Sequence, residues 1–156
     1  MQLLVKEIKD AIAILHLDRV KTSVVANRVD ARKWAWVILA VPPILDVFLA
    51  SASYPSGVGS IFTSFVFWPI MLKTASLLAA IFGMSYLAEK YFKGGNAHWP
   101  FFTVLAYSSV FLWLTPVASL LELLHVVSFS LSNLIWSAGL ILVFVVAYNY
   151  LIHERH

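Results

Sequence analysis

The sequence predicts an all-α membrane protein, a bundle of four transmembrane helices preceded by an amphipathic helix at the membrane interface. Two observations predict this class. Only 12% of the 156 residues are charged, whereas roughly 25% are charged in soluble domains. The apolar residues also gather in long runs, and the longest run, 61–88, carries a single charge, Lys73. At about 1.5 Å per residue, a helix of that length exceeds the hydrocarbon core of a bilayer, which is about 30 Å thick.

Residues 1–33 are predicted to form an amphipathic helix and a basic connector in the cytoplasm. Residues 1–17 alternate apolar and charged faces at helical spacing, but they are too short and too charged to span a bilayer, which favours an interfacial helix. Asp30 is placed to cap the helix that follows. The connector carries five basic side chains: Arg19, Lys21, Arg28, Arg32 and Lys33. They either bind anionic headgroups or only fix the topology.

Four segments are predicted to cross the bilayer: 34–53, 69–91, 100–115 and 134–152. Pro42 and Pro43 are expected to kink the first crossing, and Pro116 is expected to end the third. The stretch 117–127 is then a short helix or a fifth crossing, and 59–67 is an interfacial or re-entrant helix. A short tail, 153–156, closes the sequence.

The distribution of positive charge predicts the orientation of these crossings. Seven of the 11 Lys and Arg residues precede Trp34, which places the N-terminus in the cytoplasm. With four crossings, the loop that contains Lys90 and Lys93 falls on the same side, together with Arg155. A fifth crossing would move the C-terminus to the outside.

Four polar residues stand within or beside the apolar segments, toward the outer half of the bilayer: Asp46, Lys73, Glu122 and His125. One hypothesis is a polar cavity, with an Asp46–Lys73 ion pair, that binds a headgroup, an ion or a proton. The alternative is structural: Lys73 reaches the headgroups, and Asp46 accepts from backbone freed near Pro43. Glu122 and His125, three residues apart, are expected to form a hydrogen-bonded pair.

No enzymatic activity, cofactor or metal site is predicted. A metal site in a helical bundle needs a second Glu-x-x-His copy joined by further Glu ligands, and the sequence contains only one such copy, at Glu122 and His125. The absence of cysteine excludes thiolate chemistry, and no nucleophile elbow or phosphate loop is present. The basic residues adjoin apolar runs, which favours anionic lipid over nucleic acid as their partner. Ala79 and Gly83, spaced four apart, are predicted to form a close helix contact.

The region around the third crossing resembles the Yip (Ypt-interacting protein) domain family of small multi-pass membrane proteins. A glycine-bearing loop at 94–100 runs into a span with Leu-Ala-Tyr-Ser at 105–108, and Pro116 follows nine residues after Tyr107. The N-terminal layout, a short helix leading through VANRVDARKWAW into a proline-bearing span, also fits prokaryotic members. The resemblance covers about 30–152.

The resemblance implies a membrane scaffold without catalytic residues. Relatives in eukaryotes take part in vesicle traffic and engage Rab-type GTPases, whereas this sequence has a short cytoplasmic N-terminus and is closer to the compact prokaryotic members. The family usually has five spans, which favours 117–127 as a further crossing. We therefore expect a scaffold or trafficking factor that contacts other membrane proteins or further copies of itself. A small transporter or lipid-handling protein that uses the polar cluster is the alternative.

Overall fold

The computed structural model describes residues 2–52, 67–90, 98–126 and 130–153, and the regular structure in these ranges is entirely helical. Lys93 with most of its loop, residues 127–129, the tail from 154 and nearly all of 59–67 lie outside the described residues. The helices, in chain order, are α1 (Gln2–Leu15), α2 (Arg19–Asn27), α3 (Val29–Ala52), α4 (Phe67–Ala88), α5 (His98–Ser108), the 3-10 helix η3 (Ser109–Trp113), α6 (Leu114–Leu123) and α7 (Leu131–His153).

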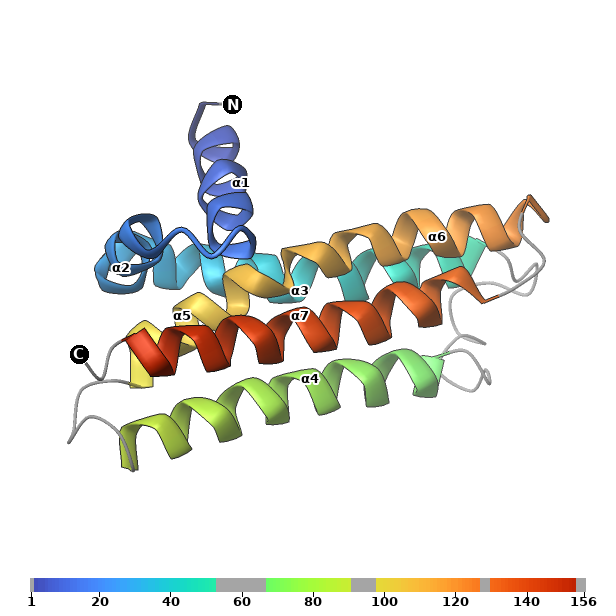
Figure 1. The fold of residues 1–156 in the computed structure, drawn as a ribbon. Helices are drawn as coiled ribbons and strands as arrows, with labels where there is room; N and C mark the ends of the chain where they lie inside the picture. Colours follow the sequence, from blue (N-terminus) through green and yellow to red (C-terminus); the bar gives the residue numbers. More distant parts are fainter. Residues whose placement is uncertain (1, 53–66, 91–97, 127–129, 154–156) are drawn as a thin grey trace.

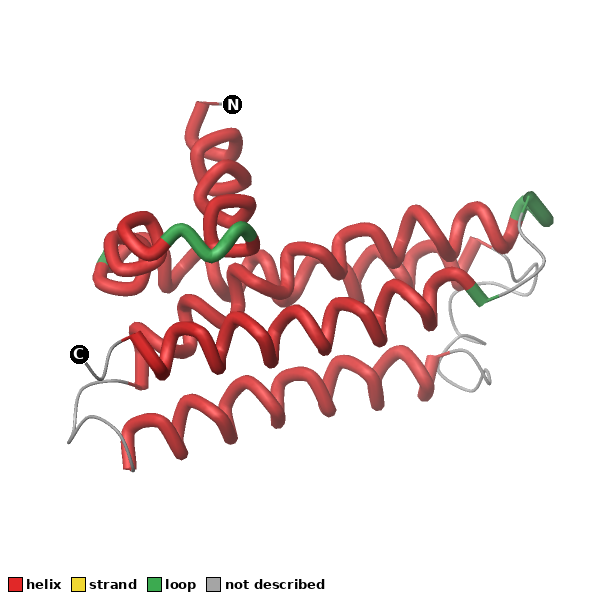
Figure 2. The backbone as a smooth tube through the Cα atoms, viewed as in Figure 1, coloured by secondary structure: helices red, strands yellow, loops and turns green. Residues whose placement is uncertain are grey.

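The long helices run side by side, and α1 stands across them (Figure 1). Helices α3, α4 and α7 form three rods, and α5, η3 and α6 together form the fourth. Helices α1 and α2 lie toward the end where α3 begins, so this end of the bundle carries an additional helical layer. The continuous path of the fourth rod can be followed in Figure 2.

Three helical segments are long and apolar enough to cross a membrane: Phe67–Ala88, His98–Leu123 and Leu131–Ile152. The chain is therefore a membrane protein by the length and composition of its helices. Helix α3 has a comparable length of 24 residues, but Arg32 and Lys33 lie near its start and Asp46 lies inside it.

Helix α5 forms the centre of the bundle. Its residues from Phe101 to Ser108 are all buried, and it contacts α1, α2, α3, α4 and α7. A helix that is surrounded on every side needs apolar residues all round rather than one apolar stripe. This explains why the segment shows no amphipathic pattern, and it places Tyr107 in the interior, where it is fully buried.

The fourth rod continues past Pro116, which differs from the expected end of the third crossing at residue 115. Pro116 lies in the first turn of α6 and cannot donate to the carbonyl of Leu112, four residues earlier. The Thr115 hydroxyl donates to that carbonyl instead, at 2.7 Å. The helix therefore runs on to Leu123, and most of 117–127 belongs to the fourth rod rather than to a separate crossing.

The proline pair of α3 is accommodated in a related way, through another helix. Pro42 lacks the N–H that would normally bond to the carbonyl of Ile38. The indole Nε1 of Trp113 donates to this carbonyl at 3.0 Å. The bond joins α3 to η3 and allows α3 to remain helical across Pro42 and Pro43.

We predict that Trp113→Phe lowers the free energy of unfolding by about 1–2 kcal/mol, because it leaves the buried Ile38 carbonyl without a donor. The measurement is detergent-solubilised unfolding followed by circular dichroism. Trp68→Phe, at a position where the tryptophan is 60% exposed, is the matched control and should change little. Equal stability of the two variants would contradict the role of this bond.

The basic connector contains a helix that the sequence-based interpretation left out. Asp18 caps α2 by accepting from the backbone N–H of Lys21 at 3.1 Å. Thr22, Val25 and Ala26 of α2 are buried, and α2 packs against α5. This packing stabilises a nine-residue helix that would be marginal in isolation. Arg28, whose backbone is extended, separates α2 from α3.

Candidate functional site

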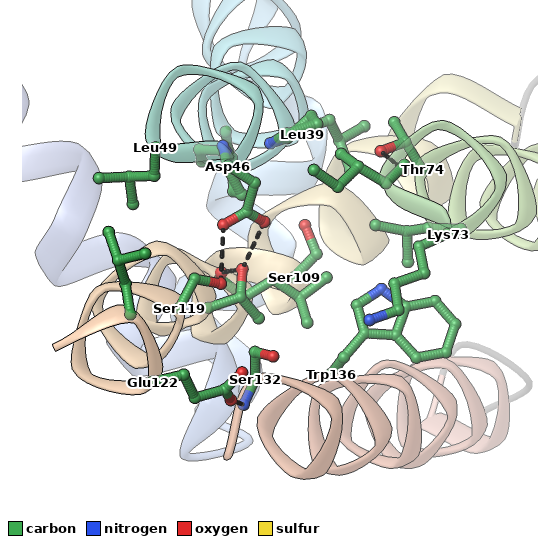
Figure 3. A pocket seen from close by; sticks show the side chains of 18 residues that line it. Leu39, Asp46, Leu49, Lys73, Thr74, Ser109, Ser119, Glu122, Ser132 and Trp136 are labelled. Atoms are coloured by element: carbon green, nitrogen blue, oxygen red, sulfur yellow. Dashed lines mark hydrogen bonds between the residues drawn. The ribbon is translucent and has the colours of Figure 1, made fainter. Parts of the chain in front are cut away.

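A polar cavity of about 320 Å³ lies between α3, α4, α6 and α7, toward the end of the bundle away from α1 and α2. Asp46, Lys73 and Glu122 are the charged residues of its lining. They enter from three different helices and face a common space (Figure 3). Hydroxyl groups of Thr74, Ser109, Thr115, Ser119 and Ser132 also line it. Three of the four polar residues singled out in the sequence therefore share one cavity.

Asp46 lies beside two hydroxyl groups of the α6 segment. Its two carboxylate oxygens each lie 3.3 Å from a hydroxyl, one from Thr115 and one from Ser119. These partners come from a neighbouring helix and not from the backbone near Pro43, which corrects the structural alternative derived from the sequence. Asp46 and Lys73 also do not form the ion pair of the other hypothesis. The Lys73 ammonium donates instead to the side-chain oxygen of Asn133 in α7.

Glu122 caps a helix rather than pairing with His125. Its carboxylate accepts from the backbone N–H of Ser132, at 2.6 Å, in the first turn of α7. A carboxylate is favourable there because the first N–H groups of a helix lack partners and carry partial positive charge. His125 lies beyond the end of α6, with a φ of 55°, and is exposed. The expected Glu122–His125 side-chain pair is therefore wrong, because the helix ends before His125.

The close helix contact occurs at a different glycine from the predicted one. Ala79 and Gly83 are both exposed, and no atom lies within 4 Å of a Cβ built on Gly83. At Gly139 in α7, a Cβ would lie 2.4 Å from Cδ2 of Leu112. The small residue that permits close packing is thus Gly139, whereas Ala79 and Gly83 face outward from the bundle.

A second polar site lies at the other end of the bundle, and we call it the Arg28 cluster: Arg28, Glu7, Asp10 and Tyr107. The Arg28 guanidinium pairs with Glu7 and lies 2.9 Å from a carboxylate oxygen of Asp10. The Tyr107 hydroxyl donates to Glu7 and lies 3.5 Å from the guanidinium. Glu7 and Asp10 are only 5% and 7% exposed. The cluster joins α1, the α2–α3 junction and α5.

The Arg28 cluster corrects the assignment of Arg28 to the membrane surface. Burial disfavours the guanidinium charge, but the charge of Glu7 and the hydrogen bonds to Asp10 and Tyr107 outweigh burial, so the pKa of Arg28 lies above its ordinary value. Arg28 is therefore an internal counter-ion. Sequence reasoning missed Glu7 and Asp10 because a charged helix face is normally solvated; their only signal is the three-residue spacing, which places them on one face of α1.

The other basic residues of the connector remain toward the surface. Arg19, Lys21 and Lys33 are exposed. The Arg32 guanidinium carbon lies 5.7 Å from the centre of the Trp99 ring, which is a cation–π distance. The end of the bundle near α1 and α2 therefore presents free positive charge beside aromatic residues, as is typical of the headgroup region.

Helix α1 keeps an apolar stripe that the rest of the structure does not cover. Leu4, Ile8 and Ile12 follow at four-residue spacing and are 41%, 38% and 47% exposed. The buried face of α1 carries Ala11 and Ile14, which are fully buried, beside Glu7 and Asp10. The helix thus binds the bundle through a mixed apolar and acidic face and leaves a second apolar stripe partly exposed.

Comparisons with known proteins do not assign the chain to a family: no family model, curated protein or solved structure matches it. The resemblance to the Yip family rests on the sequence features at 94–116 and on the N-terminal layout alone. Chemically, the described residues offer two features, a cavity with unlike charges and an internal ion cluster. Within the described ranges, His, Asp and Glu do not form a group of three that could hold a metal ion.

Proposed function

We propose that the chain is a non-enzymatic membrane scaffold that crosses the bilayer four times with its N-terminus in the cytoplasm. The crossings are α3, α4, the α5–α6 rod and α7. The proposal for α3 is supported by its length and by its position alongside the other rods (Figure 1). The orientation is supported by the exposed Arg19, Lys21 and Lys33 near α2 and the start of α3.

The arrangement of α1 is the observation that carries the scaffold function. The Arg28 cluster holds α1 across the bundle, while its apolar stripe is open and Lys6 and Lys9 are exposed. An apolar face flanked by lysines is typical of a helix that lies in the headgroup region. In this position α1 and α2 form a basic platform on the cytoplasmic surface, suited to anionic headgroups and to acidic faces of other membrane proteins.

The test is purification of the full chain from its native membranes and identification of stoichiometric partners. We expect a protein partner that is lost when Arg19, Lys21 and Lys33 are changed together to Gln, because these exposed charges do not belong to the Arg28 cluster. Changing the exposed Lys90 to Gln, outside the platform, is the matched control. Recovery of the same partner with the triple variant would contradict the platform.

The topology of these variants can be checked in the same preparations. The sequence has no cysteine, so single cysteines at Asn96 and Ser130 can be labelled separately. Labelling of position 96 from the cytoplasmic side and of position 130 from the outside is required by four crossings. The same side for both positions would exclude the proposed topology.

A second candidate function, lipid handling or transport, is favoured by the cavity. A volume of about 320 Å³ with two carboxylates and one ammonium in its lining is suited to a polar ligand. This function differs from the scaffold in a simple observable, because it requires a small molecule or lipid that stays with the purified protein.

A further inference from the structure

The polar cavity adjoins an apolar groove on the surface of α3 and α4. The groove has a volume of about 540 Å³ and is lined by side chains such as Ala40, Ile44 and Val47 of α3 and Met71 of α4. The cavity and the groove share three lining residues, Leu39, Pro43 and Thr74. The polar cavity and the apolar groove therefore adjoin at these three side chains, and a ligand with a polar head and an apolar chain could occupy both where these side chains move apart.

The carboxylate of Asp46 lacks a strong donor in this cavity. Both of its hydroxyl contacts are 3.3 Å long, beyond the usual range of about 2.5–3.0 Å for such bonds. Moreover, a hydroxyl has one proton, and that of Thr115 is directed to the Leu112 carbonyl at 2.7 Å. A half-buried carboxylate with this deficit is a site for an N–H group that carries positive charge.

The other two charges define the rest of the ligand. Glu122 already accepts a short hydrogen bond, 2.6 Å, from the backbone N–H of Ser132. Lys73 has three donors, of which one is directed to Asn133, so it can also serve an anionic group. With two carboxylates and one ammonium, the lining carries a negative balance. The complementary ligand has a primary ammonium next to an anionic phosphate.

We infer that the cavity and the groove together bind a lipid with a phosphoethanolamine-type headgroup. The ammonium binds Asp46, the phosphate lies toward Lys73, and an acyl chain occupies the groove between α3 and α4. A choline headgroup does not meet the requirement of Asp46, because its quaternary nitrogen has no N–H. This inference rests on the second candidate function and on the proposed membrane crossings.

The test uses the full chain, equilibrated with vesicles of equal parts phosphatidylethanolamine, phosphatidylcholine and phosphatidylglycerol, then purified and examined by native mass spectrometry. We expect about tenfold preferential retention of phosphatidylethanolamine over phosphatidylcholine, the amount that one charge-assisted hydrogen bond provides. Asp46→Asn should abolish this preference. Equal retention of the two lipids by the unmodified protein, or an unchanged preference in Asp46→Asn, would overturn the inference.

The groove is tested by a separate pair of variants that leaves Asp46 in place. Ala40→Phe fills the groove, whereas Ala79→Phe places the same ring on an exposed position of α4 outside it. We expect only Ala40→Phe to lower lipid retention, and this result stands even if Asp46→Asn does not fold. Equal effects of the two variants would overturn the assignment of the groove as the site of the acyl chain.

A competition experiment distinguishes binding of a whole lipid from binding of a free phosphoethanolamine molecule. Lysophosphatidylethanolamine should displace the bound lipid, and free phosphoethanolamine should do so much less well, because it lacks a chain. Equal competition by the two compounds would leave a headgroup site without a lipid and overturn the inference. None of these outcomes affects the scaffold proposal, which is measured by partner recovery with exposed platform residues.

Discussion

Replacement of Arg28 by alanine is expected to destabilise the protein by about 3–5 kcal/mol, the cost of leaving buried charges without their partner. Glu7 and Asp10 are nearly inaccessible to solvent. The Arg28 guanidinium is the positive group that forms an ion pair with each of these two carboxylates. The loss should be seen as a lower midpoint of unfolding in detergent and as faster proteolysis of α1, because the cluster holds this helix to the bundle.

Two control variants separate the Arg28 cluster from general effects of charge. Arg19→Ala removes an exposed arginine and should change the stability by no more than about 0.5 kcal/mol. The combination of Glu7→Gln, Asp10→Asn and Arg28→Met removes all three charges and should recover much of the loss, because no buried charge is then unpaired. If Arg28→Ala were as stable as Arg19→Ala, the cluster would not be what holds α1.

Gly139→Leu is expected to lower the free energy of unfolding by about 3 kcal/mol through overpacking. The new Cβ would lie 2.4 Å from Cδ2 and 3.1 Å from Cγ of Leu112, and the ring of Phe111 is 3.6 Å away. Leu112 is only 3% exposed, so rotation of its side chain moves the conflict into the core. The expected structural response is a separation of α7 from η3.

Gly83→Leu is the matched comparison for this prediction. No atom lies within 4 Å of a Cβ at Gly83, and leucine has a higher helix propensity than glycine by up to about 1 kcal/mol. This variant should be as stable as the unmodified protein or more so, measured by thermal unfolding in the same detergent. A large loss at Gly83 together with none at Gly139 would restore the helix contact that the spacing of Ala79 and Gly83 predicts.

Both predictions depend on where tertiary contacts turn out to lie, and the same is true of the prolines. Pro42 and Pro116 would each leave a carbonyl without a donor, and local rules therefore predict a kink or a helix end. The indole of Trp113 and the hydroxyl of Thr115 supply the missing donors. Thr115 is adjacent in the sequence, whereas Trp113 is 75 residues from Ile38, so only the first of these could have been anticipated locally.

The all-helical class and the approximate positions of the long helices follow from the sequence by itself, because the length of an apolar run and its low charge are local properties. Three of the helices meet the length and composition required to cross a membrane. The sequence also predicted that Asp46, Lys73 and Glu122 lie in the same half of the bundle. The direction of each crossing and the position of a residue along it together give the depth of that residue in the bilayer.

Only the tertiary structure decided which partner each polar residue takes. Helical periodicity assigned Glu7 and Asp10 to a polar face, but it could not indicate that Arg28, 21 residues beyond Glu7, turns that face inward. It likewise could not show that Asp46 contacts Ser119 or that Glu122 caps α7. A hydrogen bond is short-ranged and directional, so its partners depend on how helices that are distant in sequence pack together. Hydrophobicity, in contrast, is a property of each residue and can be read directly from the sequence.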